Sequence, residues 1–218
     1  IIILFKIARK IGSSNIIEIV DRSHKVPFFI KLFFNLVSLS FSKNQKKIGS
    51  TNDLSSTIQD LGTTFIKLGQ FLATRPDIIG EELTKNLEKL QDKLPPFSKS
   101  LAENIIREEL GELTAKNIIE FSDPIAAASI AQVHKAKINE GNTIKDVAIK
   151  VLRPNIKEIF NSEIDAIMML AYLVETLIPK TKRLKLIEVV FLFKEITNHE
   201  MDLRFEAAAA NELSLIHI

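Results

Sequence analysis

The chain contains no cysteine, no tryptophan and only four histidines among its 218 residues. The absence of cysteine excludes disulfide bonds, thiolate nucleophiles and thiolate-bound metals. Four scattered histidines do not predict a dedicated zinc site. The net charge of +2 is too small to indicate a nucleic-acid partner. We therefore expect this chain to supply no metal site and to bind no nucleic acid.

The chain also lacks a long apolar run. A membrane-spanning helix needs about 20 consecutive apolar residues, and no segment reaches that length. Residues 27–41 (PFFIKLFFNLVSLSF) come nearest, but they include Lys31 and Asn35. They lie in a basic, phenylalanine-rich lead, residues 1–48, in which lysine and arginine outnumber the acidic residues. Two interpretations stay open for this segment: a helix packed on a protein core, or a helix on the surface of an anionic membrane.

The length and composition set the size of the fold. With 46% hydrophobic residues, the chain can bury one good core, or one and a half small domains. Its first residue is Ile1 rather than methionine, so we expect a fragment of a longer protein.

Residues 49–80 have the apolar periodicity of one long helix. The apolar stripe comprises Leu54, Ile58, Leu61, Phe65, Leu68 and Leu72. Lys67 and Gln70 are three residues apart, so they share a face of this helix. Gly69 lies beside them, and a glycine inside a helix costs about 1 kcal/mol relative to alanine. Its presence indicates the close approach of another backbone or of a ligand.

Further helices follow this one. A helix is predicted to end at the Pro95–Pro96 pair, because proline cannot continue a helix. Ser100 and Glu103 have the spacing of a capping box, which predicts a helix that runs from there to Gly111. Residues 49–116 are therefore predicted to be helical.

The pattern changes to strands near Ile118. Strands are predicted at residues 118–121, at residues 130–138 and around Lys150. The connections are predicted to be a turn at Ser122–Pro124, an alanine-rich loop at Ala126, Ala127, Ala128 and Ser129, and a hairpin turn at residues 139–142.

The last strand places a cation among apolar residues. Val147, Ile149 and Val151 alternate with Ala148, Lys150 and Leu152, so the two sets lie on opposite faces of the strand. A cation in such a setting needs an anionic partner. That partner is either a carboxylate or a phosphate.

Two long helices are predicted after the strands, at residues 156–178 and 184–213. The second carries Glu200, Asp202 and Glu206. Asp202 and Glu206 are four residues apart, which places them on one face of a continuous helix. On their own, these acids are typical of a solvated helix face.

Together these motifs resemble the UbiB family of atypical protein kinase-like proteins. Val-Ala-Ile-Lys is the sequence around the strand lysine of protein kinases. The matching segments, in the family's order, are Lys67-x-Gly69-Gln70 (KxGQ), Leu90–Pro96, Pro124–His134 (PIAAASIAQVH), Val147–Val151 (VAIKV), Glu200-x-Asp202 (ExD) and Glu206–Ala208. They cover about residues 50–211. Each segment alone is weak, but six in order are specific.

The resemblance implies an α+β fold, in which a helical KxGQ extension packs on a kinase-like small lobe with a small antiparallel sheet. We expect the large lobe to be absent from this chain. The implied domains are the lead at residues 1–48, the extension at 49–116, the small lobe at 117–213 and a tail at 214–218 that departs from the family pattern.

The resemblance also implies an ATP site. Lys150 would bind the α and β phosphates and pair with Glu206, while Ala148 would pack against adenine. The loop from Ala126 to Ser129, including Ala127 and Ala128, takes the place of a glycine-rich loop. Since alanine is less permissive than glycine, we expect altered nucleotide selectivity and poor protein-kinase activity. The ATP-binding set is then Ala126, Ala127, Ala128, Ser129, Ala148, Lys150 and Glu206.

A regulatory role is implied for the KxGQ and ExD motifs. Lys67, Gly69 and Gln70 would fold over the active site, and we expect Lys67 to pair with Glu200 or Asp202. Neither an HRD-type catalytic loop nor Asp-Phe-Gly occurs, so no catalytic residue and no metal ligand is assigned. The expected cofactor is ATP with Mg²⁺ bound by the large lobe.

The expected partners are isoprenoid quinone precursor lipids or quinone-biosynthesis proteins, with a membrane surface as a further partner. The expected location is the cytoplasmic face of a bacterial inner membrane, where the protein would be peripheral. We expect a full-length atypical kinase or ATPase, with this fragment alone inactive. The alternative is a non-catalytic helical lipid-binding or scaffold module with a vestigial kinase lobe.

Overall fold

The computed structural model describes residues 53–90, 94–141 and 143–216. The predicted lead at residues 1–48 therefore lies outside the described residues. Contacts between residues divide the chain into two compact units. We call them the helical unit, with the described residues up to 90 and residues 159–197, and the sheet unit, with the described residues of 94–158 and 198–216. Each unit is described by itself.

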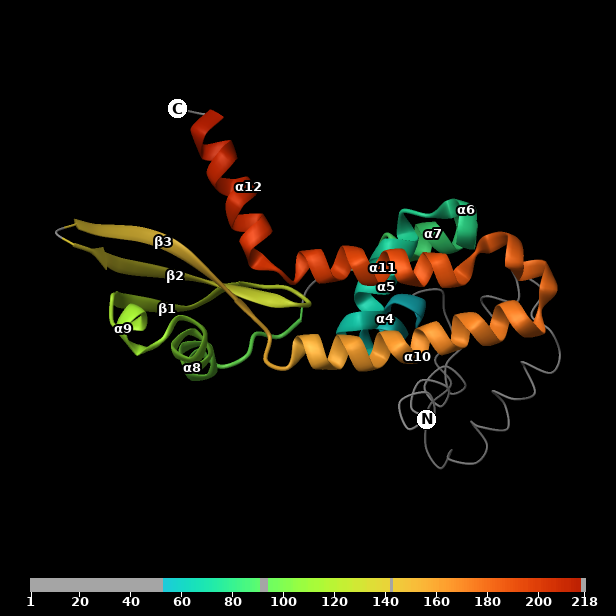
Figure 1. The fold of residues 1–218 in the computed structure, drawn as a ribbon, viewed down its shortest axis with the longest axis horizontal. Helices are drawn as coiled ribbons and strands as arrows, with labels where there is room; N and C mark the ends of the chain where they lie inside the picture. The colour runs from blue at the N-terminus through green and yellow to red at the C-terminus, as the bar shows by residue number, and fades with distance from the viewer. Residues whose placement is uncertain (1–52, 91–93, 142, 217–218) are drawn as a thin grey trace, which may run out of the picture. The chain divides into compact units, whose positions relative to one another are not determined.

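The sheet unit contains three antiparallel strands in the order β1-β2-β3 (Figure 1). The strands are β1 (Ile118–Ala127), β2 (Ala131–Glu140) and β3 (Thr143–Leu152). The β2–β3 pairing is regular from Ala131 opposite Leu152 to Glu140 opposite Thr143. This small open sheet with its helices confirms the predicted α+β class.

Strand β1 is longer than predicted. The predicted turn at Ser122–Pro124 is wrong, because β1 passes through these residues and ends at Ala127. The pairing with β2 shifts register on both sides of Pro124, which has no N–H to donate to a neighbouring strand. The strand thus accommodates the proline as an irregularity. As a result Ala126 and Ala127 belong to β1, and only residues 128–130 connect β1 to β2.

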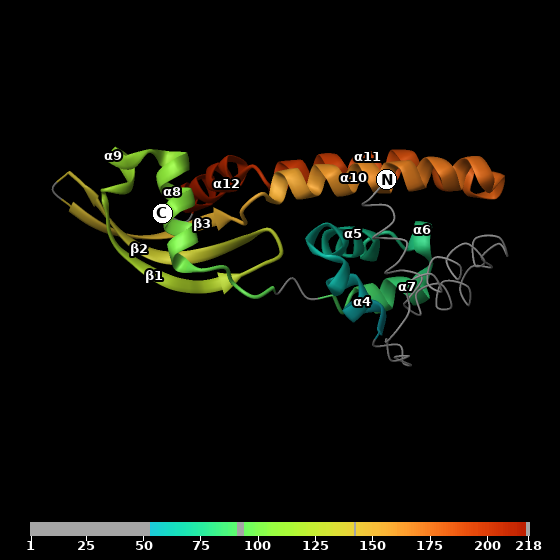
Figure 2. The same ribbon diagram turned by 90° about the horizontal axis from the view of Figure 1, so that it is seen from below.

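Helix α8 (Lys99–Leu110) covers one face of this sheet, followed by the short α9 (Glu112–Ala115) (Figures 1 and 2). The core between α8 and the sheet is formed by Ala102, Ile106 and Val151, with Phe97, Ile105, Ala115, Ile118, Phe121 and Ile149 around it. Because Ile149 and Val151 belong to this core, the predicted alternation of β3 is confirmed. Lys150 lies on the opposite face.

The caps of α8 confirm one prediction and correct another. The N-terminal cap is Ser98 and not the predicted Ser100, since the Ser98 hydroxyl accepts the Leu101 N–H at 3.3 Å. The helix ends at Gly111, as predicted, with a φ of +78° that glycine adopts without strain. The cap therefore lies two residues before the one that the sequence spacing predicts.

In the described part of the helical unit, three short helices take the place of the long helix predicted at residues 49–80, and a fourth short helix follows them. They are α4 (Asp53–Leu61), α5 (Thr63–Ala73), α6 (Pro76–Ile79) and α7 (Glu81–Leu87). Gly62 interrupts the chain with a φ of +116°, and Gly80 does so with a φ of +82°. The apolar stripe from Leu54 to Leu72 continues across Gly62, so it does not reveal that break. Helix α7 ends at Leu87, well before the proline pair at which the sequence predicted its end.

Two longer helices complete this unit. Helix α10 (Ile156–Leu177) and helix α11 (Leu186–Glu200) run side by side and are joined by a 3₁₀ turn, η1 (Pro179–Leu184) (Figures 1 and 2). The ring of Phe193 on α11 lies 5.7 Å from that of Phe160 on α10 and 5.6 Å from that of Phe71 on α5. The first pair is edge-to-face and the second is tilted, and these ring contacts help to hold the three helices together.

None of the helices between residues 53 and 216 has both the length and the apolarity to cross a membrane.

The helix predicted at residues 184–213 is broken. Helix α11 ends at Glu200, and α12 (Leu203–Ile216) begins after Met201 and Asp202. Met201 is 2% exposed, so this junction is anchored in the protein interior. Because Asp202 precedes α12, it does not share a helical face with Glu206, and that prediction is wrong.

Candidate functional site

The face of the sheet away from α8 carries Lys150. In the strand register, Lys150 lies opposite Val133, and Val133 lies opposite Ala126. Directly paired residues lie on the same face of a sheet, and alternate residues of one strand do as well. Ala126, Val133, Ala148 and Lys150 therefore share one face, which we call the open face. Ala126 and Ala148 are exposed.

Lys150 is held by a carboxylate from α12. Its Nζ atom donates a hydrogen bond to Oε2 of Glu206 at 2.6 Å. The predicted ion pair between these two residues is thus present, across 56 positions of sequence. The side chains are 34% and 58% exposed. A pair with this exposure contributes at most about 1 kcal/mol to stability, so its main effect is to orient the ammonium group.

The alanine-rich connection is a tight turn. The Ala128 N–H donates to the Ala131 carbonyl oxygen at 2.8 Å. Among the described residues, the only non-glycine residues with positive φ are Asn155 and Lys185. The alanines therefore adopt ordinary backbone conformations, and glycine is not required at any of them. Ser129 is fully buried, so its side chain faces inward, away from any ligand over the turn.

The ExD motif lies at the junction between α11 and α12. Asp202 accepts hydrogen bonds from Arg204, from Nε at 2.8 Å and from Nη2 at 2.5 Å. Its Oδ1 atom also accepts the Arg204 backbone N–H at 3.2 Å, as a helix-capping aspartate does. The hydrogen bonds from the Arg204 side chain lower the pKa of Asp202 to about 2. Asp202 is therefore ionised and holds the start of the helix that carries Glu206.

The KxGQ motif lies on α5 of the helical unit. Gly69 is buried, and a Cβ atom there would collide with the Leu90 side chain and touch Ile58 and Leu87. The close approach predicted from this glycine is present, but it is made by apolar side chains rather than by backbone or ligand. Lys67 and Gln70 are half-buried. Since Lys67 and the ExD acids belong to different units, their predicted pairing stays a prediction.

Comparison with known proteins places this geometry in a family. Residues 89–215, more than half of the chain, match the ABC1 atypical kinase-like domain. The chain belongs to the ABC1 atypical kinase-like family. The matched range includes the whole sheet, Lys150 and Glu206, and it confirms the resemblance inferred from the motifs.

Proteins named "Probable protein kinase UbiB" are similar to this ABC1 kinase-like chain. The protein from Marinobacter nauticus is 36% identical over 190 residues, 87% of this chain and 34% of that protein. The one from Shewanella frigidimarina is 38% identical over 192 residues, 87% and 34% of the two chains. The one from Pseudomonas aeruginosa is 40% identical over 161 residues, 73% and 30% of the two chains. The chain thus spans about a third of the length of these relatives.

Arg153 is a residue of this ABC1 kinase-like lobe that sequence analysis missed. Its Nε and Nη2 atoms donate to the Ala128 carbonyl oxygen at 3.0 and 2.9 Å, and Nη2 also donates to the Pro95 carbonyl oxygen at 3.0 Å. Its backbone N–H donates to the Ile130 carbonyl oxygen at 2.8 Å. An arginine after a strand carries no sequence signal for this, because the partners are distant in sequence.

A buried polar network beneath the turn was also missed. The Gln132 amide bonds to both the N–H and the C=O of Phe97, at 2.9 and 3.2 Å, and lies 2.9 Å from Nε2 of His134. His134 Nδ1 lies 2.9 Å from the Ser122 carbonyl oxygen. With Gln132 as the donor to Nε2, these partners assign a neutral ring that donates from Nδ1. Gln132 and His134 are fully buried, so the network belongs to the core of the lobe.

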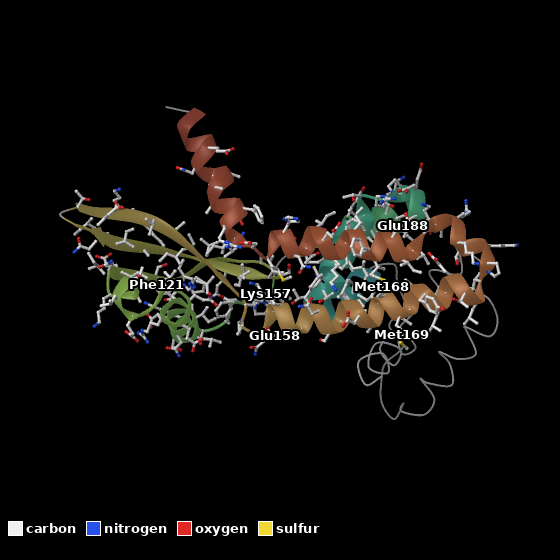
Figure 3. All side chains as sticks on the ribbon, in the orientation of Figure 1. Phe121, Lys157, Glu158, Met168, Met169 and Glu188 are labelled. Atoms are coloured by element: carbon white, nitrogen blue, oxygen red, sulfur yellow. The ribbon has the colours of Figure 1, made fainter. Side chains whose placement is uncertain are left out.

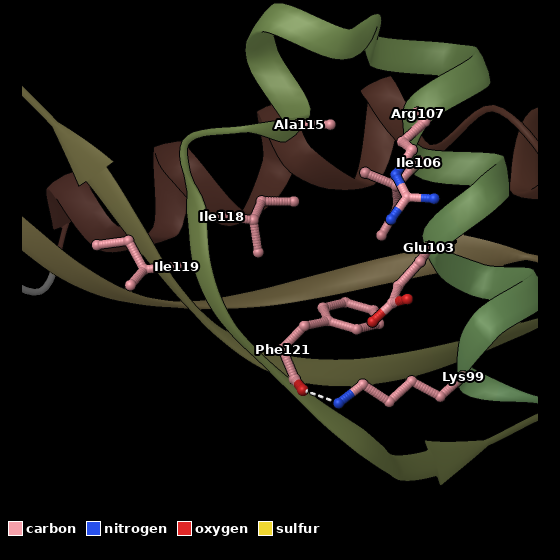
Figure 4. A pocket seen from close by; sticks show the side chains of 8 residues that line it. All are labelled: Lys99, Glu103, Ile106, Arg107, Ala115, Ile118, Ile119 and Phe121. Carbon is pink, nitrogen blue, oxygen red and sulfur yellow. Dashed lines mark hydrogen bonds between the residues drawn. The ribbon is translucent and has the colours of Figure 1, made fainter.

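The sheet unit also has a cavity of about 300 Å³ between α8, α9 and β1. Phe121 lies at its wall beside Glu103, and Lys99 donates a hydrogen bond to the Phe121 carbonyl oxygen (Figure 4). The Phe121 ring stacks on His134 at 4.3 Å between the ring centroids, and Figure 3 shows its position in the lobe. This cavity lies on the α8 side of the sheet, so it is separate from the open face.

The open face suits a nucleotide better than a metal. The ammonium group of Lys150 is oriented by Glu206 and remains one-third exposed, which is the arrangement a phosphate oxygen requires. Within the described residues, no group of three histidine, aspartate or glutamate side chains could hold a metal ion. The residues present therefore fit the phosphates of a nucleotide, while the ligands for an accompanying Mg²⁺ are not assigned.

Proposed function

We propose that this chain is the nucleotide-binding small lobe of a UbiB-type atypical kinase or ATPase. The observation that carries the proposal is the 2.6 Å ion pair between Lys150 and Glu206 on the open face. In kinases the corresponding strand lysine and helix glutamate must pair before phosphoryl transfer. Here the pair is already formed by β3 and α12.

The chemistry of the open face supports ATP as the ligand. Lys150 supplies a compact positive charge for the α and β phosphates, and Glu206 keeps it in place. Ala126, Val133 and Ala148 are apolar and lie on the same face as Lys150, so we expect them to contact the adenine ring. When bound, Mg²⁺ would neutralise phosphate charge that the single lysine leaves unbalanced. No residue of this chain is assigned to the phosphoryl-transfer step itself.

The wider role follows from the family. We infer that the full-length protein supports ubiquinone biosynthesis as a peripheral protein at the cytoplasmic face of a bacterial inner membrane. Its clients would be isoprenoid quinone precursor lipids or quinone-biosynthesis proteins. The match to the ABC1 kinase-like family, the name "Probable protein kinase UbiB" of the similar relatives and their bacterial source support this inference.

The direct test is ATP affinity of the full-length protein, measured by calorimetry or with a fluorescent ATP analogue. Replacing Lys150 with alanine removes a charge-assisted contact of about 1.5–3 kcal/mol, so we expect a loss of affinity of about 10- to 100-fold. Lys145→Ala is the matched control. Lys145 lies on the same strand but on its other face and pairs with Glu140, so ATP affinity should stay within about twofold. Unchanged ATP affinity in Lys150→Ala would refute the proposal.

One observation favours the alternative of a lipid-binding or scaffold module. Several apolar residues of α10 and α11 are exposed, among them Met169 (Figure 3), Tyr172, Leu177 and Phe191. Liposome flotation of the full-length protein, with and without ATP, separates the two functions. Binding to liposomes together with no measurable ATP affinity would favour the alternative. ATP affinity that depends on Lys150 favours the nucleotide-binding lobe.

A further inference from the structure

The turn at residues 128–130, which connects β1 to β2 and which we call the alanine turn after Ala128, is held by a side chain that lies outside it. Arg153 follows β3, and its guanidinium group donates two hydrogen bonds to the Ala128 carbonyl oxygen, at 3.0 and 2.9 Å. Its backbone N–H adds a bond to the Ile130 carbonyl oxygen at 2.8 Å. Arg153 therefore contacts both the first and the last residue of the turn at residues 128–130.

Arg153 also connects the turn to the Pro95–Phe97 segment, which is itself hydrogen-bonded to β2. Its Nη2 atom donates to the Pro95 carbonyl oxygen at 3.0 Å, and the guanidinium carbon lies 5.9 Å from the centre of the Phe97 ring. Phe97 is in turn bonded through both its backbone groups to Gln132, a fully buried residue of β2. These hydrogen bonds therefore connect three parts of the sheet unit, namely the turn, the Pro95–Phe97 segment and β2.

These contacts restrain the backbone N–H and side-chain groups of the turn that would otherwise bind a phosphate. The Ala128 N–H is used within the turn, in its bond to the Ala131 carbonyl oxygen at 2.8 Å. The Ser129 side chain is fully buried. In a glycine-rich loop, by contrast, the backbone N–H groups can point toward a phosphate, because glycine permits backbone conformations that other residues avoid. Alanine alone does not prevent this, since the alanines here have ordinary conformations.

We propose that Arg153 is a positioning residue that restrains the alanine turn and so limits how strongly the lobe holds the phosphates relative to the nucleoside. The proposal rests on the proposed function, because it concerns the same nucleotide site. Arg153 acts through the turn, since these guanidinium donors are directed at carbonyl oxygens. None of these Arg153 hydrogen bonds goes to Val133 or Ala148, the residues that face the adenine in this scheme.

The test compares Arg153→Gln with the wild-type full-length protein in its affinity for ATP and for adenosine. We expect the ratio of ATP to adenosine affinity to rise about fivefold or more, because the released turn can direct its amides at phosphate while the adenosine contacts stay unchanged. Arg153→Lys, which can reach one carbonyl but cannot reproduce the guanidinium fork, should fall between the two. Arg183→Gln, at an exposed arginine of η1, is the control and should match the wild type.

Amide hydrogen exchange provides the second measurement. The Ala128 amide should exchange faster in Arg153→Gln, while amides in the middle of β2 and β3 keep their wild-type protection. An unchanged affinity ratio, or a ratio that falls, would overturn the proposed restraint. So would unchanged exchange at Ala128. If Arg153→Gln does not fold, Arg153→Lys carries both measurements.

The two proposals fail in different ways. If the wild-type protein binds no ATP, or binds it independently of Lys150, the proposed function fails, and the exchange at Ala128 still tests whether Arg153 restrains the turn. If ATP binding depends on Lys150 but the ratio of ATP to adenosine affinity is the same in Arg153→Gln as in the wild type, only the proposed role of Arg153 is refuted.

Discussion

The two faces of the three-stranded sheet differ in almost every respect although they are built by the same strands. On the face under α8, Gln132, His134 and Val151 are buried, and the polar side-chain atoms of Gln132 and His134 are hydrogen-bonded within the core. On the open face, Ala148 is exposed and Lys150 forms an ion pair with partial access to solvent. We therefore expect the covered face to contribute mainly to stability and the open face, as proposed above, to contribute mainly to ligand binding. Substitutions on the two faces should therefore separate stability from binding.

The largest effect is expected in the core of the covered face. Ile106 is 6% exposed and packs with Ala102 and Val151, so Ile106→Ala should lower the free energy of unfolding by about 2–5 kcal/mol. Chemical denaturation measures this. The control is Ile144→Ala, because Ile144 on β3 is 65% exposed and its truncation should cost about 0.5 kcal/mol or less. Equal losses for the two variants would contradict the division.

The second prediction concerns the buried polar network. Gln132→Ala leaves the N–H and C=O of Phe97 and the ring of His134 without their partner, which should cost about 1–3 kcal/mol of unfolding free energy. Lys135→Ala is the control on the same strand, since Lys135 points to the open side and is 65% exposed. It should change the stability by about 0.5 kcal/mol at most. A Gln132→Ala variant as stable as wild type would show that the network is not structural.

The third prediction concerns the helix that brings Glu206 to the open face. Asp202→Ala removes the cap of α12 and should cost about 1 kcal/mol of unfolding free energy. Asp202→Asn keeps a capping oxygen but loses the charge that faces Arg204, so its cost should be smaller. If Asp202→Ala and Asp202→Asn lower the free energy of unfolding equally, helix capping is not how Asp202 contributes to stability.

The pH dependence of the free energy of unfolding follows from the Asp202 carboxylate. The pKa of this group is lowered to about 2 in the folded protein from an ordinary value of 3.8. A carboxyl group with a lowered pKa stabilises the folded state fully above its ordinary pKa and loses that contribution as the pH falls through the folded value. The stability difference between wild type and Asp202→Asn should therefore be constant above about pH 4 and shrink toward pH 2. A difference that grows toward low pH would contradict the assignment.

The smallest effect on stability is expected at the centre of the open face. Lys150→Ala removes an ion pair that is 34% and 58% exposed, so the free energy of unfolding should change by about 1 kcal/mol or less. The same variant should lose most of its ATP affinity. A stability loss as large as that of Ile106→Ala would mean that Lys150 belongs to the core, and the comparison between the faces would fail.

Local patterns predicted much of the sheet and the charge pair in its site. The alternation around Lys150 has the period of a strand, and it correctly placed Ile149 and Val151 on one face and Lys150 on the other. Glu206 was chosen as the partner of Lys150 through family resemblance, and the pair is present. Periodicity alone did not select Glu206 over other acids of the same region.

Features that depend on distant neighbours were not predictable. Gln132 meets Phe97 across 35 positions, and Arg153 meets Pro95 across 58. No local pattern marks either residue. The break at Gly62 was missed for a different reason: a glycine can adopt either a helical or a positive φ, and only the folded chain shows which one it takes.

The irregular course of β1 has a consequence for solubility. As the first strand in the order β1-β2-β3, β1 forms an outer edge of the sheet, and unpaired edges invite pairing with strands of other molecules. Pro124 removes one donor from this edge, and the register shifts beside it disturb the regular spacing of the others. A strand of another molecule would therefore not find evenly spaced backbone N–H and C=O groups with which to pair along this edge. We therefore expect Pro124 to make this edge a poor template for pairing with a strand of another molecule.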